Sequence, residues 1–332
     1  MAVYTHVDQA SLDAFLAAYD LGASLALEGI AEGVENSNYR LVTERGRYIL
    51  TLYEKRVDPA DLPFFLELMN HLAAKGVPCP TPIRARDGGA LQRLCGRPAS
   101  IVSHLAGASV RRVQAAHCAA LGAALARLHL AGADFSGGRP NSLSVASWRG
   151  LFEACRGGAD QLQGGLAAEI EAELDVLERA WPEDLPHGVI HADLFPDNVF
   201  FACQALTGII DFYFACVDIV AYDIAICLNA WCFEPDGAFN ITKARLMLAA
   251  YRAERPFADH ELEALPLLAR GAALRFLLTR LFDWQNRVEG ALVAVKDPLE
   301  YLHKLRFHRG VSGPGAYGLD QVSDRDGLAP QP

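Results

Sequence analysis

The sequence predicts an α+β protein in which a small antiparallel sheet with one main helix precedes a larger, mainly helical lobe. Three observations support this fold class. Short segments rich in β-branched and aromatic residues, with glycine-containing turns between them, fill most of the stretch up to residue 105. From Val113 onward, apolar residues recur mostly at helical spacing. One short strand-rich stretch, 187–212, interrupts the helices and carries most of the candidate catalytic side chains.

The first lobe, residues 1–105, is expected to hold the sheet and one helix. The helix is predicted at Asp61–Lys75, because apolar residues recur there at helical spacing and Gly76 follows. The strands are predicted at Ser24–Ile30, Asn38–Thr43, Tyr48–Tyr53 and Pro98–Leu105.

The second lobe, residues 106–309, is expected to be mainly helical. Its helices are predicted at Ala115–Ala131, Leu166–Ala180, Asp218–Phe233, Thr242–Arg252, His260–Val288 and Lys296–Phe307. The stretch 310–332 is rich in Gly, Pro, Ser and Asp, so it is predicted to be a disordered tail.

Composition narrows the class of protein. The net charge of −10 argues against broad nucleic-acid binding, which needs a basic face. No uncharged apolar run reaches the roughly 20 residues of a membrane helix, and the N-terminus has no signal-peptide pattern. The eight cysteines include no Cys-x-x-Cys pair, so we expect reduced, mostly buried thiols in a cytoplasmic protein.

The segment His191-Ala192-Asp193-Leu194-Phe195-Pro196-Asp197-Asn198, followed by Gly208-Ile209-Ile210-Asp211, carries the candidate chemistry. Phosphoryl transfer from ATP needs a cation on the phosphates and a carboxylate near the acceptor hydroxyl. Asp193 is predicted to be that carboxylate. Asn198 and Asp211 offer the oxygen ligands that Mg²⁺ prefers. The alternative is that His191 and Asp193 merely bind each other in a loop while Asp211 caps a turn.

This pattern, His-x-Asp-x-x-x-x-Asn and then Ile-Asp-Phe, resembles the catalytic and metal loops of the aminoglycoside phosphotransferase and choline kinase superfamily. The resemblance implies a two-lobed, protein-kinase-like fold with ATP and Mg²⁺ as cofactors, and it assigns His191 and Asp193 to the catalytic loop. It also implies that Glu32–Tyr39 covers the nucleotide phosphates, so that Asn36, Ser37 and Asn38 bind ATP; a plain hairpin turn is the alternative. Ser103 and Leu105 would give backbone contacts to the adenine.

One position departs from the superfamily pattern. Thr51 stands where related kinases carry a Lys or Arg that contacts phosphate. Lys55 lies four residues further along the same strand face and could reach the phosphates, with Glu67 as its partner. An ordinary solvated strand-end charge at Lys55 is the alternative. The chain has no P-loop, since none of its lysines follows a glycine.

Longer stretches resemble the homoserine kinases of this superfamily. They include Glu32–Tyr39, Tyr48–Glu54, Tyr222–Ile226, Asn229–Cys232 and Lys296–Pro298, and the resemblance runs from residue 1 to 309. In that group Thr is usual at the position of Thr51. The resemblance implies L-homoserine as the small-molecule acceptor.

Homoserine is a zwitterion, so its site needs a cation and an anion. Arg275, Arg280 and Arg287 are candidates to bind its carboxylate. The candidates to bind its ammonium group are Asp218, Tyr222, Asp223 and Asn229.

Two other functions remain open on the sequence. The acceptor could be choline, an aminoglycoside or a methylthiosugar. The chain could also be a kinase-like scaffold that binds nucleotide without catalysis. The sequence predicts neither a nucleic-acid partner nor a membrane partner, and it makes no prediction of an oligomeric state.

Overall fold

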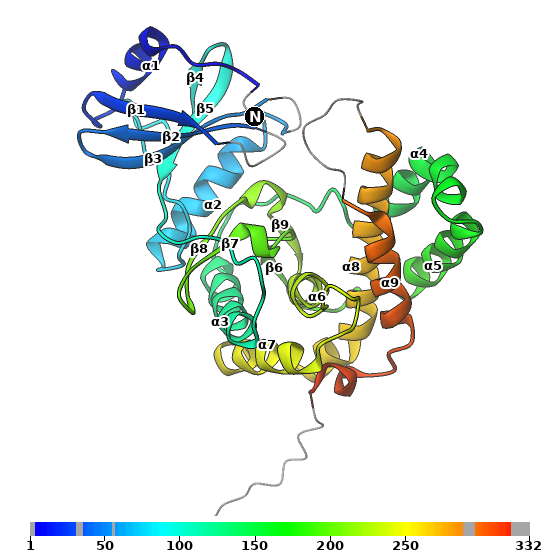
Figure 1. Ribbon diagram of the computed structural model, residues 1–332. Helices are drawn as coiled ribbons and strands as arrows, with labels where there is room; N and C mark the ends of the chain where they lie inside the picture. Colours follow the sequence, from blue (N-terminus) through cyan, green and yellow to red (C-terminus); the bar gives the residue numbers. More distant parts are fainter. Residues whose placement is uncertain (1–3, 31–35, 55–56, 288–295, 320–332) are drawn as a thin grey trace, which may run out of the picture.

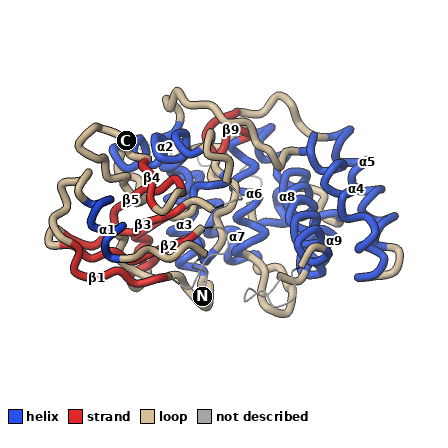
Figure 2. Tube along the Cα trace, turned by 90° about the horizontal axis from the view of Figure 1, so that it is seen from above, coloured by secondary structure: helices blue, strands red, loops and turns tan. Residues whose placement is uncertain are grey.

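The structure is a computed structural model that describes residues 4–30, 36–54, 57–287 and 296–319. An antiparallel sheet lies at one end of the molecule and most of the helices lie at the other (Figure 1). Seen from above, the strands of the sheet gather on one side, and the helices α4 (Val145–Leu162) and α5 (Leu166–Ala180) lie on the opposite side (Figure 2). The predicted α+β fold class is confirmed.

Within the described residues the sheet has five strands in the order β1-β2-β3-β5-β4. The register places Asn38 opposite Thr51 and Tyr48 opposite Ser103. One face of the sheet packs against helix α1 (Gln9–Leu16) in a common apolar core. The strands are β1 (Ser24–Gly29), β2 (Ser37–Thr43), β3 (Gly46–Leu52), β4 (Gln92–Leu94) and β5 (Arg97–Ser103).

The predicted strands and the first predicted helix, α2 (Leu62–Ala74), are confirmed with ends shifted by up to two residues. The sequence analysis missed α1 and β4. Helix α1 has only eight residues and begins at the capping carboxylate of Asp8, which accepts the Ser11 N–H at 2.8 Å. Strand β4 has three residues before the tight turn at Cys95, too few for an alternating pattern to be recognised.

The rest of the chain is mainly helical, as predicted. Helix α4 was missed because glycines and charges dilute its apolar face, which buries Trp148, Phe152 and Cys155. The predicted helix at 218–233 begins later than expected, because the chain first forms strand β9 (Cys216–Ile219) against strand β6. The remaining helices are α3 (Ala115–Gly132), α6 (Val220–Trp231), α7 (Ile241–Glu254), α8 (Asp259–Gln285) and α9 (Pro298–Arg309).

Helices α3 and α7 approach each other closely. A Cβ atom at Gly122 of α3 would lie 2.1 Å from the backbone oxygen of Met247 in α7, so only glycine fits there. This contact matters for the site, because α3 carries His129 and α7 carries Tyr251, whose side chains meet beneath the catalytic loop.

The expectation of a disordered tail is wrong for residues 310–319. Pro314–Tyr317 forms a short 3-10 helix, and Tyr317 is fully buried. Its hydroxyl contacts His308 Nδ1 at 2.8 Å, and the other ring nitrogen of His308 lies 3.2 Å from Asn229 Oδ1. The composition of this stretch predicts disorder, but composition cannot show that one aromatic side chain, Tyr317, is buried against His308. Residues 320–332 lie outside the described residues.

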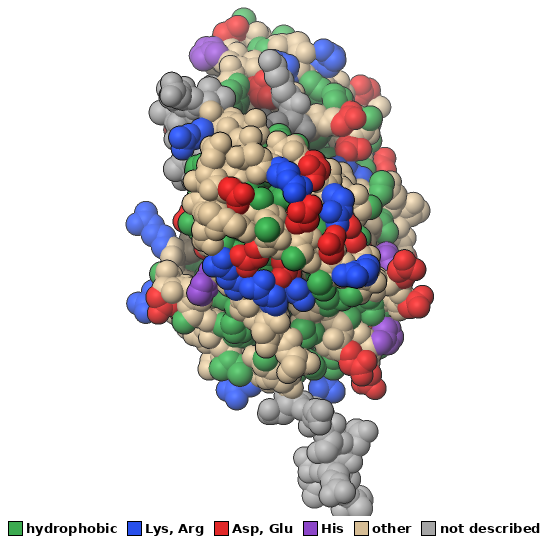
Figure 3. Space-filling model, turned by 90° about the vertical axis from the view of Figure 1, so that its right-hand side faces the viewer, with side chains coloured by type: hydrophobic (Ala, Val, Ile, Leu, Met, Phe, Trp, Pro, Cys, Tyr) green, Lys and Arg blue, Asp and Glu red, His purple; other side chains and the backbone are tan. Residues whose placement is uncertain are grey.

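On the outer face of α4, α5 and α9, basic and acidic side chains are interspersed (Figure 3). Arg149 pairs with Glu178 at 2.6 Å, and Arg306 pairs with Glu169 at 2.6 Å. Exposed pairs of this kind are each worth at most about 1 kcal/mol. The stability of the fold therefore rests on its buried core. No helix in the described ranges is both long enough and apolar enough to cross a membrane.

Six of the eight cysteines are buried and none forms a disulfide, as the sequence predicts. Burial raises the pKa of the Cys79 thiol to about 12 and that of the Cys155 thiol to about 11. Such thiols are poor nucleophiles, because the reactive thiolate form is scarce.

The first prediction concerns stability against pH. Burial, with Lys304 nearby, lowers the pKa of His308 to about 3. The unfolded chain therefore binds a proton at His308 below pH ~6.5 that the folded chain does not bind. The free energy of unfolding should fall by about 1.4 kcal/mol per pH unit for this group as the pH drops below that value.

Urea unfolding midpoints at pH 7.5 and 5.5 measure this effect. The variant His308→Gln should show a smaller difference between the two midpoints than the parent. The control His6→Gln changes an exposed histidine and leaves the buried contact intact. Equal pH dependence in His308→Gln and the parent would contradict the assignment.

Candidate active site

The catalytic loop lies between strand β6 (His187–Ile190) and a short 3-10 helix, Pro196–Asn198. Strand β6 is held by β9, and the hairpin of β7 (Val199–Ala202) and β8 (Ala205–Ile209) follows the loop. The chain turns sharply at Ala192, which has a φ of 61°. A non-glycine residue in this left-handed region costs of order 1 kcal/mol and needs support from its surroundings. This turn directs Asp193 out of the core.

His191 is fully buried and supports the loop from within. Its Nε2 contacts the backbone oxygen of Ile210 at 2.9 Å, and its Nδ1 accepts the N–H of Asp193 at 3.3 Å. Burial lowers the pKa of His191, so the ring is neutral, with a proton on Nε2. Its ring also packs on Phe212, 4.8 Å away between centroids. His191 therefore orients Asp193 and the Ile210 peptide, a positioning role.

Asp193 keeps 20% of its side chain exposed, at the mouth of the loop. Asn198 Nδ2 donates to its backbone oxygen at 2.8 Å and to its Oδ2 at 3.3 Å. Burial raises the pKa of the Asp193 carboxyl, while Arg275, His191 and Lys296 act in the opposite direction. A carboxylate with a raised pKa is a better proton acceptor for a hydroxyl group.

Asn198 and Asp211 are brought together by the backbone. The N–H of Ile210 donates to the backbone oxygen of Asn198 at 2.9 Å, and Asp211 is the next residue along the chain. Asp211 has a φ of 65° and an exposed side chain. Because Asn198 uses its amide nitrogen on Asp193, the oxygen of the same amide is left for a cation. An amide oxygen and a carboxylate fit a hard cation such as Mg²⁺.

Asp223 anchors the loop from below. Its fully buried carboxylate accepts the backbone N–H groups of His191 at 2.7 Å and Ala192 at 2.9 Å, and it lies 3.2 Å from His129 Nε2. Burial opposes ionisation, but the hydrogen bond from His129 and the contacts with His191 outweigh it and hold the pKa of Asp223 below its usual value. The expectation that Asp223 binds the acceptor ammonium is therefore wrong.

Arg275 of α8, a candidate for the acceptor carboxylate, lies beside the catalytic loop. Its Nη1 donates to the Ala192 oxygen at 3.1 Å and is 3.8 Å from Asp193 Oδ1. The guanidinium lies over the rings of Phe276, at 3.9 Å, and Phe214, at 5.4 Å. With 3% exposure, Arg275 holds the turn at Ala192 and lends positive charge to Asp193.

Two further acceptor candidates serve the protein core instead. Asn229 is fully buried, and its Nδ2 donates to the backbone oxygens of Ala225 and Ala269. Arg280 donates to Glu300 at 2.6 Å and lies over Tyr301. The expected contacts of Asn229 and Arg280 with the acceptor are therefore wrong, because their polar atoms already have protein partners.

The remaining acceptor candidates differ in exposure. Tyr222 is buried, and its hydroxyl is shielded and has no hydrogen-bond partner within the described part of the chain. Asp218 is partly exposed and accepts Asn141 Nδ2 at 2.7 Å. Arg287 is exposed, with its guanidinium 5.6 Å from the Trp284 ring centroid. Asp218 remains a prediction, whereas a shielded Tyr222 hydroxyl cannot meet an acceptor in this conformation.

The predicted phosphate-binding residues lie where β2 meets β3. Asn38 Oδ1 accepts the Thr51 hydroxyl at 2.8 Å, so the two side chains form one polar rung on the sheet. Ser37 is fully buried; its hydroxyl donates to Glu54 at 2.7 Å and accepts the Tyr4 N–H at 2.9 Å. The expectation that the Ser37 side chain binds ATP is wrong for this reason.

Two other residues, Asn36 and Lys55, were predicted to bind the nucleotide. Asn36 is buried and its Oδ1 accepts the Glu54 N–H at 3.3 Å, so its side chain also serves the strand pair. Lys55 lies outside the described residues. Its proposed partner Glu67 is exposed on α2.

The connection from the sheet to the helices contains Ser103 and Leu105. The Ser103 hydroxyl oxygen accepts the Thr81 N–H at 2.9 Å, and the Ser103 N–H donates to the Thr81 backbone oxygen at 2.9 Å. Leu105 packs against Gly208 of β8, where an added Cβ would lie 2.8 Å from Leu105 Cδ1. The Ser103 N–H therefore has a protein partner, and backbone contacts of this connection with adenine stay a prediction.

The sequence analysis missed two side chains, His129 and Lys296, that lie next to the loop. His129 supports Asp223, but a histidine in an Ala/Leu-rich helix gives no signal of that role. Lys296 acts on Asp193, and its Nζ lies 5.1 Å from the Phe195 ring centroid. The only signal at Lys296 was its place before the Asp-Pro pair that begins α9.

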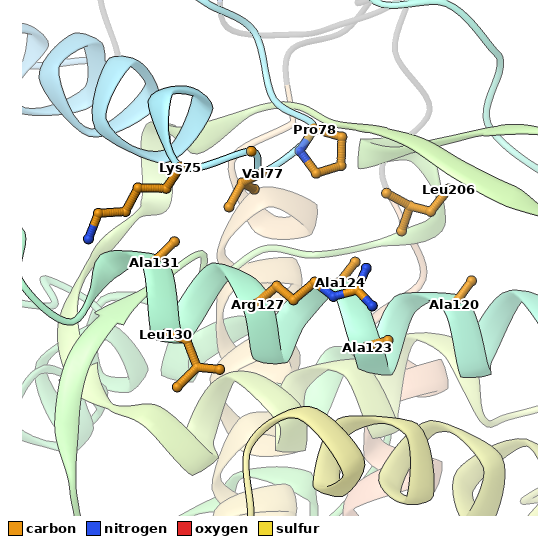
Figure 4. A pocket seen from close by; sticks show the side chains of 11 residues that line it. Lys75, Val77, Pro78, Ala120, Ala123, Ala124, Arg127, Leu130, Ala131 and Leu206 are labelled. Atoms are coloured by element: carbon orange, nitrogen blue, oxygen red, sulfur yellow. The ribbon is translucent and has the colours of Figure 1, made fainter.

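A cavity between the end of α2 and α3 is lined by Val77, Pro78, Leu206 and the alanine-rich face of α3 (Figure 4). The two cations on its wall are already bound, Lys75 to Asp134 and Arg127 to Glu254. None of the catalytic-loop residues lines it. It therefore plays no direct part in the chemistry proposed for Asp193.

Comparisons with known proteins agree with this geometry. A family model described as the phosphotransferase enzyme family matches residues 26–257. The homoserine kinase of Rhodospirillum rubrum is 63% identical over 97% of this chain and 100% of its own length. The homoserine kinase of Parvibaculum lavamentivorans is 63% identical over 96% of this chain and 100% of its own length.

Solved structures share the fold at low sequence identity. The amicoumacin kinase hAmiN, in complex with AMP-PNP and Ca²⁺, has a TM-score of 0.66 at 16% identity and covers 92% of each chain. A microcompartment-associated aminopropanol kinase has a TM-score of 0.63 at 18% identity and covers 94% of this chain and 99% of its own. By the extent of these matches, the chain belongs to the phosphotransferase enzyme family and, within it, to the homoserine kinases.

Proposed function

We propose that the chain transfers the γ-phosphate of ATP to the side-chain hydroxyl of L-homoserine, giving O-phospho-L-homoserine and ADP. The observation that carries the proposal is the 63% identity to homoserine kinases over 97% of the chain, which includes the whole catalytic loop. This reaction is a step of threonine biosynthesis. Unpaired, mostly buried cysteines support a reducing compartment, and we place the enzyme in the cytoplasm.

Asp193 is the proposed catalytic base. The acceptor oxygen attacks the γ-phosphorus, the bond to the β-phosphate oxygen breaks, and the hydroxyl proton passes to the Asp193 carboxylate. The supporting geometry is the partly exposed carboxylate, oriented by Asn198 and by the backbone contact with His191. An intact arrangement of this kind argues against a non-catalytic scaffold.

Mg²⁺, when bound, would neutralise charge on the transferred phosphates. The oxygens of Asn198 and Asp211 are its proposed protein ligands. Among the described residues no group of three or more His, Cys, Asp or Glu side chains could hold a metal by itself. The cation would therefore need phosphate oxygens and water as further ligands, as Mg²⁺ commonly does.

ATP is proposed to lie between the sheet and the catalytic loop. Asn38 and Thr51 form the polar rung that would face its phosphates, and the backbone at Ser103 and Leu105 would bind the adenine. Asn36 and Ser37 would act indirectly, by holding the ends of β2 and β3 together. Lys55 remains a candidate for phosphate contact.

The second prediction tests the acceptor. Purified protein with Mg-ATP should release ADP with L-homoserine far above the rate in buffer, and less with choline, an aminoglycoside, a methylthiosugar or another amino alcohol. A coupled assay of ADP measures each rate. If homoserine gives the buffer rate while another acceptor is turned over, the substrate assignment is wrong.

The third prediction concerns Asp193. Asp193→Asn removes the base and should lower kcat roughly 10²- to 10⁴-fold, with little change in the KM for ATP. Because burial raises the pKa of Asp193, kcat of the parent should fall on acidification at a pH above the ordinary value for a carboxyl group. The exposed Asp236, on a turn before α7, supplies a control in Asp236→Asn. Full activity in Asp193→Asn would remove Asp193 from its proposed role.

A further inference from the structure

An ion pair lies on the rim of the catalytic loop. Lys296 Nζ is 3.9 Å from Asp197 Oδ2, and the two side chains are 60% and 80% exposed. Asp197 immediately precedes the proposed metal ligand Asn198. An ion pair as exposed as this one contributes little to the stability of the fold, because water screens both charges. The stability of the protein therefore gives no reason for placing these charges beside Asp193.

Three basic side chains of the described residues act on the Asp193 carboxylate: Arg275, His191 and Lys296. Arg275 is 3% exposed and His191 is fully buried. Arg275 also holds the Ala192 oxygen and lies between two aromatic rings. Because the His191 ring is neutral, Arg275 and Lys296 carry the positive charge, and of these two Lys296 is the one exposed to solvent.

Lys296 is fixed in place by its neighbours. The next residue, Asp297, caps α9 by accepting the Leu299 N–H at 2.9 Å, and its backbone oxygen accepts Arg280 Nη1 at 3.0 Å. The Lys296 ammonium lies 5.1 Å from the centroid of Phe195, whose ring packs edge-on against Phe276 at 4.9 Å. The cation is therefore exposed but anchored to both the catalytic loop and α8.

We propose that Lys296 binds the carboxylate of the acceptor amino acid and that Asp197 binds its ammonium group. This proposal rests on the proposed function and names specificity residues for it. In homoserine the hydroxyl oxygen and the carboxyl carbon are about 5 Å apart in an extended chain, so one end reaches Asp193 while the other stays at the rim. Because the ion pair is weak in water, exchanging it for contacts with the zwitterion costs little.

This arrangement explains how the site distinguishes its acceptor from other small alcohols. Choline, aminoglycosides and aminopropanol lack a carboxylate, so each could pair with Asp197 but would leave the Lys296 ammonium group without a partner. An amino acid instead offers one group of each sign to the pair. The site therefore favours ligands that carry both charges over ligands that carry one.

The fourth prediction uses Lys296→Met and Lys296→Arg. Lys296→Met should raise the KM for homoserine roughly 10- to 100-fold, the loss expected for one charged hydrogen bond, and leave the KM for ATP within about twofold. Lys296→Arg should recover most of the affinity. Lys75→Met removes another exposed lysine with a carboxylate partner, remote from the loop, and is the matched control.

Two analogues, used as competitive inhibitors against homoserine, separate the two charges. Lys296→Met should weaken inhibition by 4-hydroxybutanoate, which lacks the ammonium group, and not inhibition by 3-aminopropan-1-ol, which lacks the carboxylate. Asp197→Asn should do the reverse. Each crossed effect is expected to be about tenfold or more.

The parent enzyme is assayed with homoserine first, so failure of the proposed function appears there as absent turnover. With an active parent, the proposal is overturned if Lys296→Met leaves the KM for homoserine unchanged. It is equally overturned if that variant raises the KM for ATP as much as the KM for homoserine, which would place Lys296 on the phosphates. Equal weakening of both analogues by either variant also contradicts it.

Discussion

The buried carboxylate of Asp223 is the constraint on which the site depends. Removing a carboxylate from water is costly, and here the N–H groups of His191 and Ala192 and the ring of His129 compensate for that cost. In return the carboxylate holds the turn in which Ala192 takes a φ of 61°. Arg275 fixes the same turn from the other side through the Ala192 oxygen. Asp193 follows immediately, so its position is set by buried side chains of the core.

Hydrogen bonds to the backbone position the proposed metal ligands in the same way. Both backbone polar groups of Ile210 are bound: its oxygen contacts His191 Nε2, and its N–H donates to the backbone oxygen of Asn198. Asp211 is the next residue, so the catalytic loop and the carboxylate proposed to bind the metal are parts of one hydrogen-bonded unit. Beneath this unit, the close approach of α3 and α7 at Gly122 brings His129 within 2.8 Å of the Tyr251 hydroxyl. Helix packing and the geometry of the reaction centre are therefore linked by physical contacts.

The sequence predicted the parts of the molecule whose signals are local. Most strands of the sheet, most helices and the segment from His191 to Asp211 are contiguous patterns, and they were found. What depends on tertiary contacts was not. Asp223 and Asn229 look like polar groups near a site, and only the fold reveals that they are buried with protein partners. Ser37 was misassigned because the sequence does not reveal that Tyr4 and Glu54 converge on its hydroxyl. Lys296 becomes notable only when α9 is placed beside the loop.

The contact of Tyr317 with His308 also limits how far the chain can be shortened. An exopeptidase trimming from the C-terminus would break this contact on reaching Tyr317. Loss of Tyr317 itself would open a space beside Phe239 and leave a buried imidazole without its hydroxyl partner. That imidazole contacts Asn229, which ties α6 to α8 through the Ala269 oxygen. The short 3-10 helix at Pro314–Tyr317 thus helps to hold α6 and α8 together, although both helices begin more than fifty residues earlier in the chain.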